Sequence, residues 1–157
     1  MNVMTATMPR RRVFGAYLQE ARSEILRYLR NPGFLLPIIL FPNVFFVMFG
    51  LVLNHGNSEA ARYMLASYST FGVMAPGLFG FGVSLALERD SGLLTLKRAL
   101  PMPPGAYLAG KMLMAVIVAL VVGALLLMLA LSVAHAPLTG TQIARLLWVD
   151  ALGVLPF

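Results

Sequence analysis

The sequence contains no cysteine and few charged residues. Charged side chains make up 11% of its 157 residues and hydrophobic ones 59%, whereas roughly a quarter of a soluble domain is charged. Without cysteine there is no disulfide framework, no thiolate metal ligand and no cysteine nucleophile. The shortage of charge, together with the apolar excess, is typical of an integral membrane protein that contacts the lipid bilayer.

Acidic residues are also scarce. The chain has 6 acidic against 12 basic residues, a formal net charge of +6. A nucleic-acid-binding domain would gather basic residues on a polar surface, but here they flank apolar runs, so we expect no nucleic-acid partner. Basic residues precede the first apolar run and recur between the second and third. The positive-inside rule then predicts a multi-pass protein of the cell (inner) membrane with a cytoplasmic N-terminus.

The pattern of apolar residues predicts an all-α integral membrane fold. Residues 13–30 read as an amphipathic helix in the membrane interface, with an ordinary solvated helix as the alternative. Asn31 and Pro32 predict a helix start, with Asn31 as its cap. Residues 1–157 are interpreted as one partial transmembrane domain. Its predicted spans are residues 33–53, 61–87 and 112–133, followed by the start of a fourth at 146–157.

Residues 88–111 form the predicted cytoplasmic loop between the second and third spans. Leu93, Leu96 and Leu100 fall on one side of a short helix, and Lys97 and Arg98 on the other. A membrane protein with such a helix at its cytoplasmic surface is expected to dock a partner there. The candidate docking and coupling residues are Glu88, Arg89, Gly92, Leu94, Leu96, Lys97, Arg98 and Pro101.

The candidate residues have different expected roles. Leu94 and Leu96 are the apolar contacts, Lys97 and Arg98 guide orientation, and Pro101 ends the helix. Glu88 has two interpretations: a solvated charge at the membrane border, or a partner for a basic residue of the N-terminal helix or of another subunit.

Small residues recur at helical spacing in two predicted spans. They are either a close helix or subunit interface or a reflection of how common glycine is in membrane helices. The candidate packing residues are Gly72, Pro76, Gly80 and Ser84 in the second span, and Ala115, Ala119 and Gly123 in the third.

No catalytic or metal site is predicted. His55 and His135 stand alone in outer loops, and no Ser, His and Asp are placed for a triad. Residues 105–111 match the first seven positions of a phosphate-binding loop, but Met112 replaces the hydroxyl residue that holds magnesium. Lys111 is therefore interpreted as a basic anchor at the lipid headgroups, and no cofactor is expected in this chain.

The order of these features resembles the membrane subunit of ABC-2 type transporters. The resemblance rests on Arg30-Asn31-Pro32 before the first span, Glu88-x-x-x-Gly92-x-Leu94, then Pro101, then Gly110-Lys111 opening the third span. Leu93 stands where the family pattern E-x-x-x-G-T-L has threonine. The resemblance covers nearly the whole chain but only about half of the family's usual six spans.

The resemblance implies a permease subunit of an ATP-driven exporter. Its loop helix would be a coupling helix docked on a separate ABC ATP-binding subunit, which would hold ATP and magnesium. A second permease subunit would complete a homo- or heterodimer, and hydrolysis would not occur in this chain. The alternative is a non-transporting membrane anchor or assembly factor that recruits a soluble partner.

Overall fold

The computed structural model describes residues 10–53, 57–99, 103–133 and 138–154, and these residues are helical apart from short connections. The first half comprises α1 (Arg10–Arg30), α2 (Pro32–Phe45), the π-helix η1 (Phe46–Val52), α3 (Ser58–Ala75) and the π-helix η2 (Pro76–Val83). The second half comprises α4 (Ser84–Asp90), α5 (Leu93–Ala99), α6 (Pro104–Ser132) and α7 (Gly140–Gly153). The described part contains no strand, as the all-α prediction requires.

Three helices are long and apolar enough to cross a membrane, as many as the sequence predicts. They are Pro32–Val52, Ser58–Asp90 and Gly105–Ser132. The second and third are longer than predicted because the helix continues past the apolar run into the charged stretch. Residues 88–90 complete α4, and α6 begins at Pro104, not at 112.

Capping residues fix several of these ends. Asn57 accepts hydrogen bonds from the backbone of Glu59 (3.1 Å) and Ala60 (3.4 Å) and so starts α3. Thr139 and Gln142 form a capping box that starts α7, several residues before the predicted 146. The predicted start of α2 at Pro32 is correct, but the Asn31 side chain makes no capping hydrogen bond.

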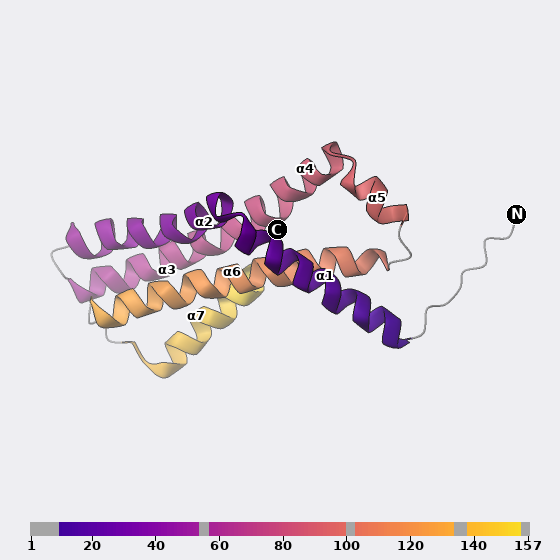
Figure 1. Cartoon of the computed structure of the whole chain (residues 1–157). Helices are drawn as coiled ribbons and strands as arrows, with labels where there is room; N and C mark the ends of the chain where they lie inside the picture. Colours follow the sequence, from indigo (N-terminus) through magenta and orange to yellow (C-terminus); the bar gives the residue numbers. More distant parts are fainter. Residues whose placement is uncertain (1–9, 54–56, 100–102, 134–137, 155–157) are drawn as a thin grey trace, which may run out of the picture.

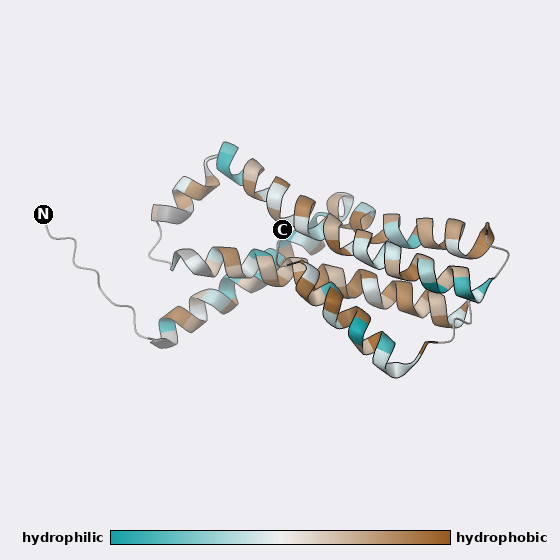
Figure 2. Cartoon of the chain, turned by 180° about the vertical axis from the view of Figure 1, so that it is seen from behind, coloured by the Kyte–Doolittle hydropathy of each residue, from teal (hydrophilic) through white to brown (hydrophobic). Residues whose placement is uncertain are grey.

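The helices form a bundle from which two segments project (Figure 1). α2, α3 and α6 lie side by side, α7 runs back along α6, α1 crosses α6, and α4 and α5 leave the bundle as an arm. Hydrophobic residues dominate the bundle, while hydrophilic ones gather at the arm and at helix ends (Figure 2). This distribution is what a lipid-facing bundle requires.

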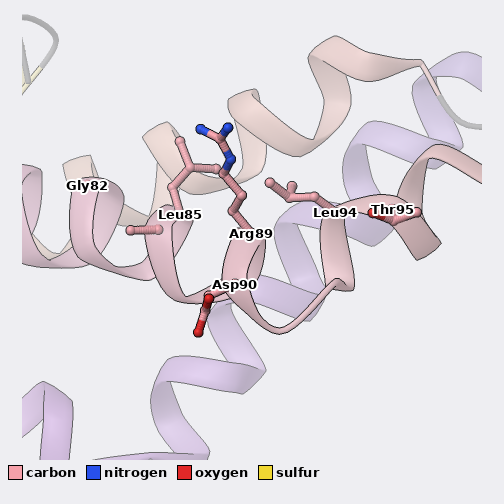
Figure 3. A pocket seen from close by; sticks show the side chains of 7 residues that line it. Gly82, Leu85, Arg89, Asp90, Leu94 and Thr95 are labelled. Carbon is pink, nitrogen blue, oxygen red and sulfur yellow. The ribbon is translucent and has the colours of Figure 1, made fainter.

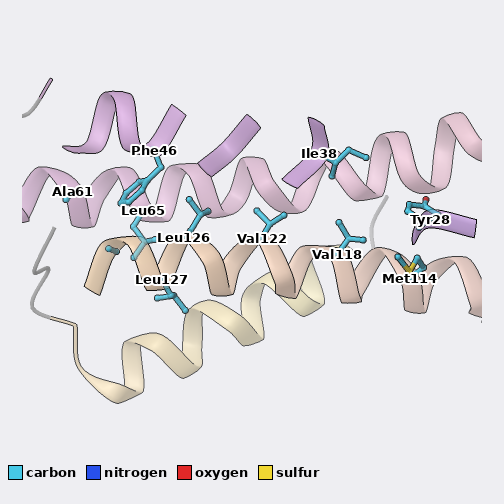
Figure 4. Packing of buried hydrophobic residues seen from close by; sticks show 11 residues of the cluster. Tyr28, Ile38, Phe46, Ala61, Leu65, Met114, Val118, Val122, Leu126 and Leu127 are labelled. Carbon is cyan, nitrogen blue, oxygen red and sulfur yellow. The ribbon is translucent and has the colours of Figure 1, made fainter. Parts of the chain in front are cut away.

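α6 is the centre of the core. Val118, Val122 and Leu126 are buried along one side of it, against Phe46 and Leu65 of the first two spans (Figure 4). On another side, Ala115 and Ala119 pack with Val73 of α3 and with Val154.

The small-residue face of the second span makes close contacts within this chain. A Cβ atom at Gly72 would lie 2.6 Å from Val122 Cγ1, and one at Gly80 would lie 2.8 Å from the Tyr28 hydroxyl. Pro76 is fully buried. Glycine at these positions therefore lets α6 and α1 approach the second span closely.

Candidate functional site

A cluster of buried ionic side chains lies where α1, α4 and α6 meet. Glu24 of α1 and Glu88 of α4 are each 2% exposed, and Lys111 of α6 is 3% exposed. Arg27, one turn after Glu24, is half-exposed and completes the charge balance. We call Glu24, Arg27, Glu88, Tyr107 and Lys111 the ionic cluster.

Lys111 is at the centre of the ionic cluster. Its Nζ lies 2.9 Å from Glu88 Oε1 and 3.5 Å from Glu24 Oε1, and it donates to Ser84 Oγ at 2.8 Å. Tyr107 donates its hydroxyl to Glu88 Oε2, and Arg27 pairs with Glu88 Oε1. These contacts link the three helices. Removing one member of a buried pair would leave the other charge uncompensated, so breaking the link would destabilise the protein.

A second polar contact joins α1 to the second span. Tyr28 donates its hydroxyl to the Gly80 carbonyl at 2.7 Å. Burial, reinforced by the nearby Glu24 carboxylate, raises the pKa of Tyr28 to about 12, so the hydroxyl remains a donor at neutral pH. Gly80 lies in the π-helix η2, whose i→i+5 hydrogen-bond pattern differs from the i→i+4 pattern of an α-helix.

Glycines of the phosphate-loop-like stretch position α1 against α6. A Cβ at Gly110 would lie 3.4 Å from backbone atoms of Glu20 and Ala21, and one at Gly105 would lie 2.9 Å from the Tyr17 hydroxyl. The two glycines therefore let the backbones of α1 and α6 approach, which brings Glu24 within reach of Lys111. The glycine spacing that resembles a nucleotide site therefore lies at a close contact between two helices.

The turn from α4 to α5 lies immediately beyond the ionic cluster. Gly92 separates α4 from α5 with a φ of 74°, in the left-handed region that glycine tolerates best. Its carbonyl accepts the first backbone bonds of α5, from Thr95 and Leu96. A sharp turn of fixed geometry thus follows directly on the helix that carries Glu88.

α4 and α5 line an open groove with a volume of about 1000 Å³ (Figure 3). Its lining includes Leu94 and Thr95 of α5 and Arg89 and Asp90 of α4. Leu96, by contrast, is 64% exposed on α5. The two leucines predicted as equivalent contacts therefore differ, because Leu94 faces the groove within the arm while Leu96 is open to a partner.

The predicted site residues fall into three groups. Glu88 is buried in the ionic cluster, whereas Arg89, Gly92, Leu94 and Leu96 belong to the arm. Lys97 and Arg98 lie in α5, but their side chains are outside the described part of the structure, as is Pro101. Ser84 joins the cluster through Lys111.

The structure corrects the interpretation of Lys111 as an anchor at the headgroups. Its side chain is buried because two carboxylates and a hydroxyl converge on it. The roles of Glu24 and Tyr107 were also missed, since a sequence shows that Glu24 is on a helix but not which helix crosses it. Among the described residues, no group of His, Asp and Glu could hold a metal ion.

Comparison with known proteins places the chain among membrane transport proteins. The family model described as ABC-2 type transporter matches residues 17–154. A protein of Bacillus subtilis (strain 168) described as "Putative transport permease YvfS" is 27% identical over 150 residues. That alignment covers 88% of this chain, which spans 58% of the relative's length. No solved structure matches the chain.

Proposed function

The chain belongs to the ABC-2 type transporter family, and on that premise we propose that it is the membrane subunit of an ATP-driven exporter. In this proposal the chain supplies spans of the transport domain, while a separate ABC ATP-binding subunit supplies ATP, magnesium and hydrolysis. A second permease subunit, identical or related, completes the transporter. The membrane is the cell (inner) membrane, and α1, the arm and the start of α6 are on its cytoplasmic side.

The observation that carries this proposal is the junction of the arm with the ionic cluster. A docking element transmits force only if its base is fixed to the spans that must move. Within the arm, α5 follows α4 directly, and α4 is tied to α6 and α1 through Glu88, Lys111 and Glu24. We therefore assign α5 as the coupling helix and α1 as an interfacial helix that moves with it.

Leu96 is the expected apolar contact with the ATP-binding subunit. Burying a leucine is worth roughly 1.5–3 kcal/mol, whereas a contact between surface charges is usually worth less than about 1 kcal/mol. Leu96 should therefore contribute more affinity than Lys97, which would mainly set orientation.

The test compares two exposed leucines at opposite ends of the bundle. Leu96→Asp in the full-length protein should reduce co-purification of the ATP-binding subunit at least tenfold, and Lys97→Ala should reduce it little. Leu53→Asp is the matched control, because Leu53 is 59% exposed beyond η1 and far from the arm. Equal co-purification with Leu96→Asp and the parent would refute docking through α5.

The alternative is a non-transporting membrane anchor, which co-purification of the ATP-binding subunit does not exclude. It would bind a soluble protein through the same arm. Reconstituted vesicles separate the two, because only a transporter shows ATP hydrolysis that responds to changes in the membrane subunit. We expect Glu88→Gln to retain the ATP-binding subunit but alter its hydrolysis rate in vesicles, whereas an anchor would show no change.

A further inference from the structure

An apolar groove with a volume of about 410 Å³ lies between α2 and the second span. Three half-exposed rings, those of Phe41, Phe71 and Phe79, line it together with the buried Ile38. The other lining residues are also apolar, and most are small: Gly33, Phe34, Pro37 and Ala75. Small side chains between large rings leave the hollow, and its lining offers a ligand apolar contacts only.

The groove extends along the first half of the span Pro32–Val52, next to α1. It reaches from Gly33 to Phe41 on this span and from Phe71 to Phe79 on the second. Such a stretch of helix is roughly 12 Å long, and one leaflet of a bilayer core is about 15 Å deep. The groove therefore matches the depth of one leaflet, which is the space that a lipid acyl chain occupies.

Polar donors lie at the end of the groove that adjoins α1. Phe34 lines the apolar groove and also a smaller one of about 80 Å³, whose lining includes Arg27, Asn31 and Ser84. The Arg27 side chain is 46% exposed, and the exposed Asn31 side chain makes no capping hydrogen bond. No acidic residue of the described chain lines the smaller groove. The apolar groove thus ends beside a guanidinium group and an amide.

We propose that the two grooves together bind an anionic phospholipid, with an acyl chain along the phenylalanines and the phosphate at Arg27 and Asn31. A guanidinium group has five donors and binds phosphate oxygens well, so Arg27 can contact the lipid and keep its pairing with Glu88. The Asn31 amide can donate to another phosphate oxygen. Basic pockets beside membrane spans are typical sites for anionic headgroups.

A helix of another membrane segment or subunit is the other candidate occupant of the apolar groove. It would cover the phenylalanines but would bring no anion to Arg27 and Asn31, so a phospholipid fits both ends of the site better. The inference rests on the membrane location of the family and not on ATP-driven export. Lipid binding and docking through α5 can therefore fail separately.

The test measures which lipid lies beside the groove. The reporter is the full chain with Phe41→Trp and Trp148→Phe in lipid nanodiscs. The parent supplies the control position, because its single tryptophan, Trp148, is 67% exposed on α7 outside the groove. The probes are phosphatidylglycerol and phosphatidylcholine with identical brominated acyl chains, which quench tryptophan on contact, each added to unbrominated phosphatidylcholine.

The anionic probe should be favoured at the groove alone. We expect brominated phosphatidylglycerol to be preferred about fivefold at position 41, the scale of one basic residue acting on an anionic lipid. The two probes should quench Trp148 of the parent about equally.

One variant tests the headgroup contact. Asn31→Asp places a carboxylate beside the phosphate and should abolish the preference for phosphatidylglycerol. Aspartate is a good N-cap residue, so α2 should still form. Gln19→Glu is the matched control: it makes the same change of charge at an exposed position of α1 outside both grooves and should keep the preference.

A second variant tests the acyl-chain contact. Gly33→Leu should lower quenching by both lipids at position 41, because it adds a side chain at the edge of the groove. The protein can accept it, since a Cβ at Gly33 would meet only Asn31 Oδ1, at 3.9 Å. Gly82→Leu is its control: a Cβ at Gly82 would meet nothing within 4 Å, and Gly82 does not line the apolar groove.

Three results would overturn the proposal. An equal preference for phosphatidylglycerol at positions 41 and 148 would mean general attraction of anionic lipid to a basic chain. No quenching by either lipid at position 41 would mean that protein covers the groove. Displacement of the brominated phosphatidylglycerol by excess glycerol phosphate would make the polar end a site for a soluble phosphate. The reporter chain alone gives these results, so they remain decisive if Asn31→Asp or Gly33→Leu does not fold.

Discussion

Lys111 Nζ lies between two buried carboxylates, 2.9 Å from Glu88 Oε1 and 3.5 Å from Glu24 Oε1, so a single ammonium group joins α4, α1 and α6. Replacing it by Lys111→Met would leave both carboxylates buried without that cation. Breaking a buried pair from one side typically costs about 3–5 kcal/mol. We therefore expect a large loss in the free energy of unfolding, measured by thermal unfolding in detergent.

Glu88→Gln is the informative partner of that variant. It leaves Lys111 its contact with Glu24, and the half-exposed Arg27 can turn to water. The loss of stability should be clearly smaller than for Lys111→Met. Equal losses would show that Glu24 does not share the ammonium charge.

Two glycines of η2 provide a matched pair. A Cβ at Gly80 would lie 2.8 Å from the Tyr28 hydroxyl, whereas one at Gly82 would meet nothing within 4 Å. Gly80→Ala should disrupt the Tyr28 hydrogen bond and cost roughly 1–3 kcal/mol. Gly82→Ala should be neutral or stabilising, because it removes backbone freedom from the unfolded chain. The same thermal unfolding measurement ranks them, and similar values would contradict the packing described here.

The stability of the turn at Gly92 should depend on how readily a residue adopts a positive φ, and not on the size of its side chain. Its φ of 74° strains any side chain, yet nothing lies near its Cβ position. Gly92→Ala should cost about 1–2 kcal/mol locally, and Gly92→Asn less, because Asn enters the left-handed region more readily. Gly92→Pro should leave insertion intact but uncouple ATP hydrolysis in the assembled transporter. Proteolysis of the arm in membranes would rank the first two, and an arm equally protected in both would contradict this.

Orientation can be measured directly because the chain has no cysteine. Single cysteines at Glu59 and Thr141 should react with an impermeant thiol reagent from outside intact cells, and one at Ser91 should not. These positions avoid Asn57 and Thr139, whose side chains cap helices. Labelling of Ser91→Cys from outside would reverse the predicted topology.

The sequence predicts the helical class and the three spans well, because long apolar runs allow few other structures in lipid. It places span ends less well, since the backbone of α4 and of α6 continues as helix through residues too charged for lipid. A short helix was predicted from the spacing of Leu93, Leu96 and Leu100, and it is present as α5, Leu93–Ala99, although Leu100 lies outside the described residues. The left-handed turn before it follows from Gly92.

The ionic cluster was only partly predictable. Pairing of Glu88 with the N-terminal helix was one of two interpretations, and the structure pairs it with Arg27 of α1. Lys111 and Glu24 could not be matched from the sequence, because their meeting depends on where α1 crosses α6. Asp150 of α7 gave no signal either: it is buried against Ser69 and Gly123, and a lone acidic residue in a short apolar run does not show which helices pack around it.

The most direct test of the central claim is a photo-crosslinking amino acid at position 96 of the full-length protein in membranes. If α5 docks the ATP-binding subunit, irradiation should join the two chains at position 96 and not at the equally exposed position 53. A complex that co-purifies but gives no adduct at position 96, or gives one equally at position 53, would contradict docking through α5.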